Sequence, residues 1–197
     1  VYIPPHEVTK DSFQKRVTVT NPSKSATALV KRQLNSSYGA TYYPWVKVSE
    51  SAGRLIWLPP SAVALGVMAH TEQKQEVWFA PAGFNRGGLS PTTCGLNVLG
   101  VSENLLAKDR DVLYDANINP IASFVTEGIV IFGQKTLQQT PSALDRINVR
   151  RLLIFVKRLV SRISNTLIFD QNLPATWNRF KGQVIPELES IKTLSLI

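Results

Sequence analysis

The chain has 197 residues, with 22 Lys and Arg against 14 Asp and Glu, so its formal net charge is +8. Hydrophobic residues make up 44% of it, which suffices for one packed domain or slightly more and excludes a largely disordered chain. No apolar stretch approaches the roughly 20 residues of a transmembrane helix. The single cysteine, Cys94, excludes an internal disulfide and a zinc site built from paired thiolates. Because the chain begins at Val1 rather than Met, we expect a piece of a longer protein.

The charge is unevenly distributed along the chain. Residues 1–54 hold 8 basic and 3 acidic residues, residues 55–145 hold 5 and 8, and residues 146–197 hold 9 and 3. Two basic ends therefore flank an acidic middle. This distribution indicates surfaces that meet acidic partners or each other.

The first third of the chain predicts a connecting segment and a β-hairpin. Residues 1–37 are polar and weakly periodic, with a short strand expected at 16–20 and a helical turn or two at 26–34. Residues 38–48 are aromatic and β-branched, which predicts a strand, and residues 54–58 predict its return after a turn. Two prolines end that strand and open a helix over 62–69.

The remainder predicts two more strand regions and three helices. An irregular glycine-rich loop at 80–88 precedes an expected strand at 96–101 and an expected helix at 103–116. Asn119-Pro120 is expected to break that helix. Further expected elements are strands at 121–126 and 129–132, a long helix at 149–169 with an apolar stripe, and a helix at 175–194 that Pro186 kinks or splits.

The long helix carries the most informative local pattern, because residues 146–169 contain six basic residues and no Asp or Glu. At 100° per residue, the five basic residues from Arg150 to Arg162 fall within an arc of about 140°. A solvated face usually mixes signs so that i,i+4 pairs form. The arc is therefore either plain solvated surface or a surface for an acidic partner, which would be a nucleic-acid backbone or an acidic protein.

Catalytic patterns are weak throughout. The two histidines, His6 and His70, have no recognisable catalytic context, and no serine lies in a G-x-S-x-G elbow. Cys94 has no obvious base partner and is interpreted as a small buried hydrophobe.

Patterns for metal or nucleotide binding are equally weak. Asp109, Asp111 and Asp115 interleave with basic residues, which favours a solvated or interface face over a metal site. The glycine-rich run 83–88 lacks the Lys-Ser/Thr of a phosphate loop, and no helix signature follows it. We therefore predict no catalytic, cofactor or metal residues.

Several separated stretches between residues 38 and 185 are distinctive in combination. They are Tyr42-Tyr-Pro-Trp-Val-Lys-Val48, Trp57-Leu-Pro-Pro-Ser61, Trp78-Phe-Ala-Pro-Ala-Gly-Phe-Asn-Arg-Gly87, Ile118-Asn-Pro-Ile121, Gly128-Ile-Val-Ile-Phe-Gly-Gln-Lys-Thr-Leu137, Asp145-Arg-Ile-Asn-Val-Arg-Arg-Leu152, Phe169-Asp-Gln-Asn172 and Trp177. In this order and spacing, the chain resembles the tail sheath protein of contractile-tailed bacteriophages. The residues that carry the resemblance are Pro44, Trp45, Trp78, Pro81, Gly83, Arg86, Gly87, Asn119, Pro120, Gly133, Thr136, Asp145, Arg146, Asn148, Arg150, Arg151 and Trp177.

The resemblance implies a structural polymer rather than an enzyme. Sheath subunits stack helically around a tail tube and contract to drive it through the host cell envelope, with no cofactor. The implied fold is α/β, a mixed sheet flanked by helices with a subtilisin-like shape, followed by a helical C-terminal subdomain. We accordingly divide the chain into a connecting segment (1–37), a sheath core (38–144) and the start of an inward-facing C-terminal domain (145–197).

The resemblance also implies partners and a location. The expected partners are other sheath subunits, the tail tube protein, and baseplate and tail terminator proteins, with no nucleic acid and no membrane insertion. The expected location is the virion tail, assembled in the host bacterial cytoplasm. Family members are usually longer and lend terminal β-strands to neighbouring subunits, and this chain stops before we expect that C-terminal strand region to finish.

The basic helix and the resemblance together suggest a contact with the tube. We hypothesise that Lys157, Arg158 and Arg162 face the tube, helped by Arg179 and Lys181. Arg150 and Arg151 either share that role or pair with carboxylates inside the fold. The alternatives are the sheath of a related injection system, such as type VI secretion or a phage-tail-like bacteriocin, a nucleic-acid-binding domain, and a hydrolase.

Overall fold

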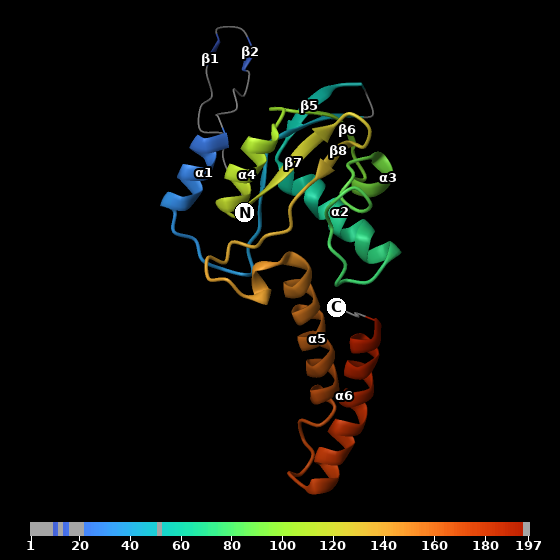
Figure 1. The fold of residues 1–197 in the computed structure, drawn as a ribbon. Coiled ribbons are helices and arrows are strands. Elements are labelled where there is room, and N and C mark those ends of the chain that lie inside the picture. Colours follow the sequence, from blue (N-terminus) through green and yellow to red (C-terminus); the bar gives the residue numbers. More distant parts are fainter. Residues whose placement is uncertain (1–9, 12–13, 16–21, 51–52, 195–197) are drawn as a thin grey trace. The chain divides into compact units, whose positions relative to one another are not determined.

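The computed structural model describes residues 10–11, 14–15, 22–50 and 53–194. The chain divides into two compact units, Val1–Arg150 and Arg151–Ile197, which are called here the first and the second unit. Figure 1 shows the strands and most helices, which belong to the first unit, and α5 and α6, of which α6 and all but the first turn of α5 belong to the second unit. The expected strand at 16–20 and His6 lie outside the described residues.

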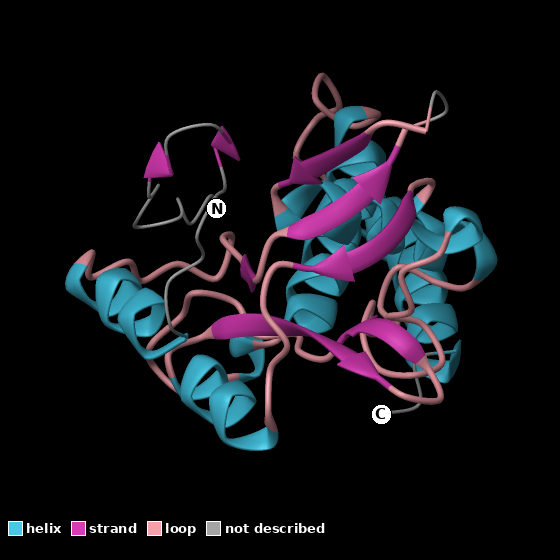
Figure 2. Cartoon of the chain, turned by 90° about the horizontal axis from the view of Figure 1, so that it is seen from above, coloured by secondary structure: helices cyan, strands magenta, loops and turns pink. Residues whose placement is uncertain are grey.

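The described strands of the first unit form two three-stranded sheets and one short pair (Figure 2). In the mixed sheet, central β7 (Ile118–Phe124) pairs parallel with β3 (Thr41–Tyr43) and antiparallel with β8 (Gly128–Ile131). The second sheet is antiparallel, in the order β5 (Leu55–Leu58), β4 (Val46–Ser49), β6 (Asn97–Val101). The short pair consists of β1 (Lys10–Asp11) and β2 (Gln14–Lys15).

The strand expected at 38–48 is divided in two. The Tyr43–Pro44 peptide bond is cis, and the residues on its two sides belong to different sheets, β3 in one and β4 in the other. The expected hairpin is present, because β4 pairs antiparallel with β5 and Val46 lies opposite Leu58. The proline thus separates two strands, whereas the sequence interpretation placed it at an edge or bulge of one strand.

Each expected helix is present, with ends that differ from the expected ones by five residues or fewer. The described helices are α1 (Pro22–Lys31), α2 (Pro60–Lys74), α3 (Pro91–Cys94), α4 (Ala107–Asp115), the 3-10 turn Ala143–Asp145, α5 (Ile147–Asn165) and α6 (Pro174–Leu194). Helix α4 begins four residues later than expected, where the Asp109 carboxylate accepts a hydrogen bond from the Leu106 amide. The short α3 follows the glycine-rich loop, where no helix was expected, and Asn119-Pro120 lies inside β7 instead of breaking a helix.

The first unit buries its apolar side chains in two clusters. One lies where β4, β7 and β8 meet α2, and its members include Val46, Val67, Ile121, Ile131 and Ile147. The other joins α1 and α4 to β3 and β7, around Leu29, Tyr43, Leu113 and Ile118. Apolar residues on the inner sides of helices and strands therefore meet as their periodicity predicts.

The second unit consists mainly of two helices. Figure 1 shows α6 running opposite to the preceding α5, with residues 166–173 connecting them. The first turns of α6 are fixed by the Trp177 indole, which donates to Asn172 Oδ1 at 2.6 Å, and by the Thr176 hydroxyl, which donates to Gln171 O at 2.8 Å. Helix α6 continues through Pro186. Neither of these helices, nor any other among the described residues, is long and apolar enough to cross a membrane.

Candidate functional site

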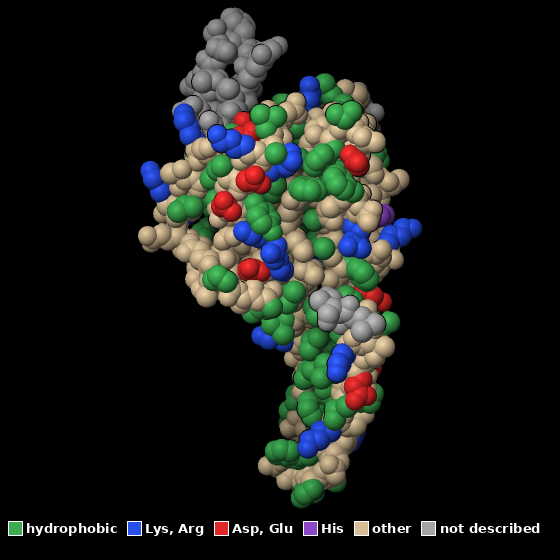
Figure 3. All heavy atoms as spheres, in the orientation of Figure 1, with side chains coloured by type: hydrophobic (Ala, Val, Ile, Leu, Met, Phe, Trp, Pro, Cys, Tyr) green, Lys and Arg blue, Asp and Glu red, His purple; other side chains and the backbone are tan. Residues whose placement is uncertain are grey.

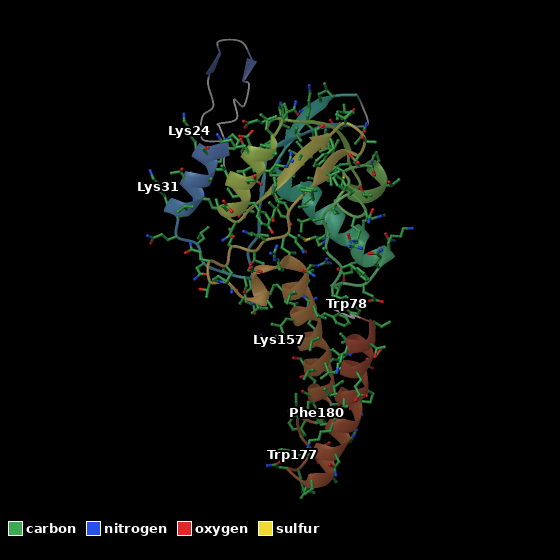
Figure 4. The ribbon with its side chains drawn as sticks, viewed as in Figure 1. Lys24, Lys31, Trp78, Lys157, Trp177 and Phe180 are labelled. Carbon is green, nitrogen blue, oxygen red and sulfur yellow. The ribbon has the colours of Figure 1, made fainter. Side chains whose placement is uncertain are left out.

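Three of the predicted basic residues lie exposed along α5. Lys157, Arg158 and Arg162 are all exposed, and α5 contains no acidic residue. Within the described part of the chain, none of the three side chains lies within 4.0 Å of a carboxylate or makes a hydrogen bond. Figure 4 labels Lys157 on α5. The three cations therefore form a surface, called here the basic face, that has no counterion of its own.

Arg150 is separated from the basic face by burial. Its side chain is only 7% exposed, its guanidinium lies 4.2 Å from the ring centroid of Tyr38, and its Nη2 donates to the Ser37 hydroxyl. These are contacts within the first unit, and no carboxylate pairs with Arg150 among the described residues. Arg150 therefore packs into the fold, but against an aromatic ring and a hydroxyl rather than the expected carboxylate.

Arg151 and the two basic residues predicted on α6 have different surroundings. Arg151 is half-buried and has a local interaction partner. Arg179 is exposed and forms an ion pair with Asp170 at 3.3 Å. Lys181 is exposed and lines a shallow cavity with Trp177. An exposed ion pair contributes little to stability, so Arg179 remains available for other contacts.

The residues that carry the resemblance lie largely inside the fold, and Trp177 alone among them is exposed. Asn119 is the best-defined example. Its amide donates to Thr41 O at 3.0 Å and to Lys135 O at 2.8 Å, and its Oδ1 accepts from the Lys135 amide at 2.6 Å. One buried side chain thus joins β3, β7 and the segment after β8. The only sequence signal for this role is a polar residue in an otherwise apolar strand.

Two of the three glycines of this set, Gly87 and Gly133, are explained by close packing, whereas the third, Gly83, has a positive φ of 82°. A Cβ on Gly87 would lie 2.5 Å from Ile131 O, and one on Gly133 would lie 2.9 Å from the Pro120 ring. Nearby, Arg86 Nε donates to Ala80 O at 3.0 Å. The glycine-rich loop is therefore held against β8 by its own backbone, as a structural loop.

The described residues contain no cluster of His, Cys, Asp or Glu that could hold a metal ion. Cys94 is buried, and its thiol lies 3.2 Å from the carbonyl oxygens of Ser90 and Leu96. Burial raises the pKa of this thiol, which disfavours the nucleophilic thiolate. Asp111 and Asp115 are exposed, so the aspartates of α4 lie mainly on a solvated face.

One ionisable pair in the first unit has perturbed acidity. The Tyr43 hydroxyl donates to Glu103 Oε2 at 2.5 Å. Burial raises the pKa of Glu103, the Tyr43 hydrogen bond lowers it, and the charge of Asp109 raises it further. Burial and the neighbouring Glu103 raise the pKa of Tyr43 above its ordinary range. The pair joins β3 to the segment before α4.

Sequence relatives provide the deciding comparison. The chain is 38% identical over 138 residues to the tail sheath protein of Vibrio phage KVP40 and 35% identical over 138 residues to that of Enterobacteria phage T4. It is 30% identical over 164 residues to the tail sheath protein of Salmonella phage ViI. Its curated homologues are tail sheath proteins. The matches cover 70% to 83% of this chain and 20% to 25% of the relatives, so the chain spans about a fifth to a quarter of their length.

Solved sheath structures share the fold. The chain matches the contracted helical sheath of the anti-feeding prophage with a TM-score of 0.69 at 30% identity, covering 81% of this chain and 41% of that one. It matches the contracted sheath complex of an extracellular contractile injection system, PVC, with a TM-score of 0.72 at 27% identity, covering 88% and 45%. The expected mixed α/β fold agrees with these sheath structures. No family model matches the chain.

The sheath homologues also bear on the question of catalysis. They are structural tail proteins rather than enzymes, which agrees with the sequence interpretation that the chain is not an enzyme.

Proposed function

We propose that this chain is part of a structural subunit of a contractile tail sheath, which polymerises helically around a tail tube and contracts to drive the tube through the host envelope. The similarity to phage tail sheath proteins supports this proposal. The proposed partners are further sheath subunits, the tube, and the baseplate and terminator proteins. The proposed location is the virion tail, assembled in the bacterial cytoplasm.

The second candidate is the sheath of a related injection system, such as type VI secretion or a phage-tail-like bacteriocin. The solved neighbours favour it, since they come from the anti-feeding prophage and an extracellular injection system. The phage relatives have the higher sequence identity. Both candidates give the chain the same structural role.

Within this role, residues 145–197, which include the second unit, are the proposed start of the inward-facing C-terminal domain. Residues 38–144 are the proposed core, subtilisin-like in shape. The observation that carries the tube contact is the basic face. Lys157, Arg158 and Arg162 are exposed without a local counterion, so an acidic tube surface would supply the missing charge. Arg179 and Lys181 are proposed as secondary contacts, because both are exposed on α6 of the same unit.

The chemistry of the basic face also suits a contact that must release during contraction. Ion pairs near the surface are screened strongly at physiological salt, where the Debye length is about 8 Å. Each contributes on the order of 1 kcal/mol or less. A ring of many such contacts together holds the tube, and little free energy is needed to break each contact.

The test is a charge reversal of the basic face, Lys157→Glu, Arg158→Glu and Arg162→Glu together. We expect this variant to lose co-assembly with tail tubes, measured by sedimentation and negative-stain microscopy. The matched control is Lys24→Glu, Lys31→Glu and Arg32→Glu, which makes the same change of charge at three exposed residues of the first unit. Lys24 lies in the first turn of α1, Lys31 is its last residue and Arg32 follows it (Figure 4). Normal tail assembly by the first variant would contradict the tube contact.

The same material tests the nucleic-acid alternative. Retention on double-stranded DNA at near-physiological salt, lost with the charge reversal, would favour a nucleic-acid-binding domain. We expect no such retention, and striated tubes instead.

A further inference from the structure

Three phenylalanines form an aromatic cluster on the surface of the first unit. Phe84 comes from the glycine-rich loop, Phe124 from the end of β7 and Phe132 from just after β8. The ring centroids of the three pairs lie 5.0, 5.4 and 5.3 Å apart. Phe84 is 50% exposed and Phe132 is 39% exposed. The cluster belongs to neither buried core cluster, so core packing does not explain it.

Arg110 of α4 completes this surface. Its guanidinium lies 5.3 Å from the Phe124 centroid and 5.8 Å from the Phe132 centroid, and its Nη1 donates to Leu105 O at 3.2 Å. Arg110 has no carboxylate within 4.0 Å among the described residues. The three rings and Arg110 are called here the aromatic–arginine patch.

A cavity of about 460 Å³ adjoins the patch. Arg110 and Phe132 belong to both, and Asp111, Tyr114 and Arg146 are further lining residues. Arg146 forms an ion pair with Asp145 at 3.3 Å and donates to the Tyr114 hydroxyl, so Arg110 is the arginine of this cavity that lacks a carboxylate partner among the described residues. Figure 3 shows hydrophobic, basic and acidic side chains intermingled on the visible face of the first unit. An occupant should therefore bring an apolar group for the rings and a carboxylate for Arg110.

Patches of this composition are typical of protein interfaces. Aromatic residues and arginine are enriched among the residues that contribute most to binding. The electrostatic interactions of the arginine become stronger when the partner excludes water from the interface. The patch is contiguous and comes from four separate segments of the chain. It is therefore a preformed surface rather than scattered exposed residues.

Helix α2 of the same unit presents the complementary chemistry. Leu65, Ala69 and Glu72 follow at i, i+4 and i+7, which places them on one face, and all three are exposed, Leu65 by 67%. Glu76 follows just after the helix and is also exposed. The opposite face of α2 is buried in the core through Val63 and Val67. Leu65 and Glu72 are separated by about 10 Å along the helix.

We propose that the aromatic–arginine patch of one copy binds the Leu65–Glu72 face of α2 on a second copy. Leu65 packs on the phenylalanine rings, and the carboxylates of Glu72 and Glu76 face Arg110. The inference rests on the proposed sheath function, in which many copies pack together. The two surfaces differ and both belong to the first unit, so the contact is heterologous and can propagate from copy to copy. A helical array requires such a contact.

The first test places a photo-crosslinking residue, p-benzoylphenylalanine, at Phe84. It is irradiated in assembled tails and, separately, in concentrated solutions of the chain. We expect a crosslinked dimer whose bond maps to residues 65–76 of the second copy. The control places the same residue at Phe169, which is fully exposed in the second unit and should give no crosslink to residues 65–76.

The second test reverses charge on each surface separately. Arg110→Glu alone, or Glu72→Arg with Glu76→Arg, should each lower the Phe84 crosslink at least about tenfold. Mixing is the stringent control, because the Arg110→Glu chain retains a native α2 face and the Glu72→Arg, Glu76→Arg chain retains a native patch. Crosslinking should return in the mixture when the photo-crosslinker is on the Glu72→Arg, Glu76→Arg chain. Recovery in the mixture also shows that neither variant is misfolded.

The outcomes separate this inference from the proposed function. Striated tubes without a crosslink to residues 65–76 would overturn the inference and leave the sheath function standing. A crosslink to residues 65–76 without tubes would support the inference and count against the sheath function. Crosslinks to the tube protein, to the second unit or to nothing in both samples would overturn the inference.

Discussion

The two units of this chain differ in how completely they bury their apolar side chains. The first unit buries Val46, Val63, Val67, Ile118 and Ile121 completely. Among the described residues of the second unit, the buried apolar side chains are Leu159 and Val184, which are 8% and 7% exposed. Others remain open there, including Ile168, Phe169, Leu173, Trp177, Ile185 and Leu194. Figure 3 shows hydrophobic side chains along the visible face of that helical pair.

This difference indicates where each unit obtains its stability. The first unit has sheets and helices that cover each other, so its core is complete within the described chain. Two helices alone bury little surface and draw most of their stability from packing against other elements. Exposed apolar surface rimmed by charged residues is typical of an interaction site, and the second unit carries its basic face beside such a surface.

The largest expected difference in stability between the two units concerns Asn119. Asn119→Ala should lower the free energy of unfolding by roughly 3–5 kcal/mol, because three hydrogen bonds are lost and buried backbone groups at Thr41 and Lys135 lose their partner. Urea unfolding followed by circular dichroism measures the effect. The control Asn178→Ala changes an exposed residue of α6 and should stay within about 0.5 kcal/mol. Equal effects would contradict the contrast between the two units.

Two helical glycines, one in each unit, give a second test of the difference in packing between the units. A Cβ on Gly66 would lie 2.3 Å from Cys94 O, so Gly66→Ala should force α2 away from α3 and cost about 1–3 kcal/mol. A Cβ on Gly182 of α6 meets nothing within 4 Å, so Gly182→Ala should stabilise the helix by about 0.5–1 kcal/mol. Thermal unfolding of both variants gives the two signs. A stabilising Gly66→Ala would show that α2 and α3 pack less closely than the structure has them.

The smallest expected effect is a pH dependence at Glu103. Its pKa is raised in the folded state, so the native state holds this proton more tightly than the unfolded chain does. This contribution is therefore complete below the ordinary carboxyl pKa and is lost as the pH rises through the folded pKa. Glu103→Gln should remove that loss and flatten the stability profile above about pH 4.5. Unfolding midpoints measured across this pH range test the prediction. If the midpoints of the variant fall with pH as steeply as those of the wild type, the assignment is refuted.

The elements that could be predicted from sequence are those with local signals. The apolar stripe of α5, its basic arc and the β4–β5 hairpin all depend on spacings of a few residues. The exposure of Lys157, Arg158 and Arg162 follows from the same helical period. The helical period does not predict that the basic arc divides into exposed and buried residues, because Arg150 is buried by Tyr38, 112 positions earlier in the chain.

Non-local pairings were beyond prediction for the same reason. The parallel pairing of β3 with β7 joins residues 77 positions apart, and no local pattern specifies it. Phe84, Phe124 and Phe132 likewise meet only because the glycine-rich loop folds over β7 and β8. The surface that we propose for contacts between copies is therefore visible only in the folded structure.

The position of Asn119 also has a consequence for backbone dynamics. The Lys135 amide belongs to no strand, yet its hydrogen is held by the Asn119 side chain at an N···O distance of 2.6 Å. Breaking that bond requires β7 and the segment after β8 to separate. In hydrogen exchange, this single amide should thus report the cooperative opening of the core, as only the most protected amides do.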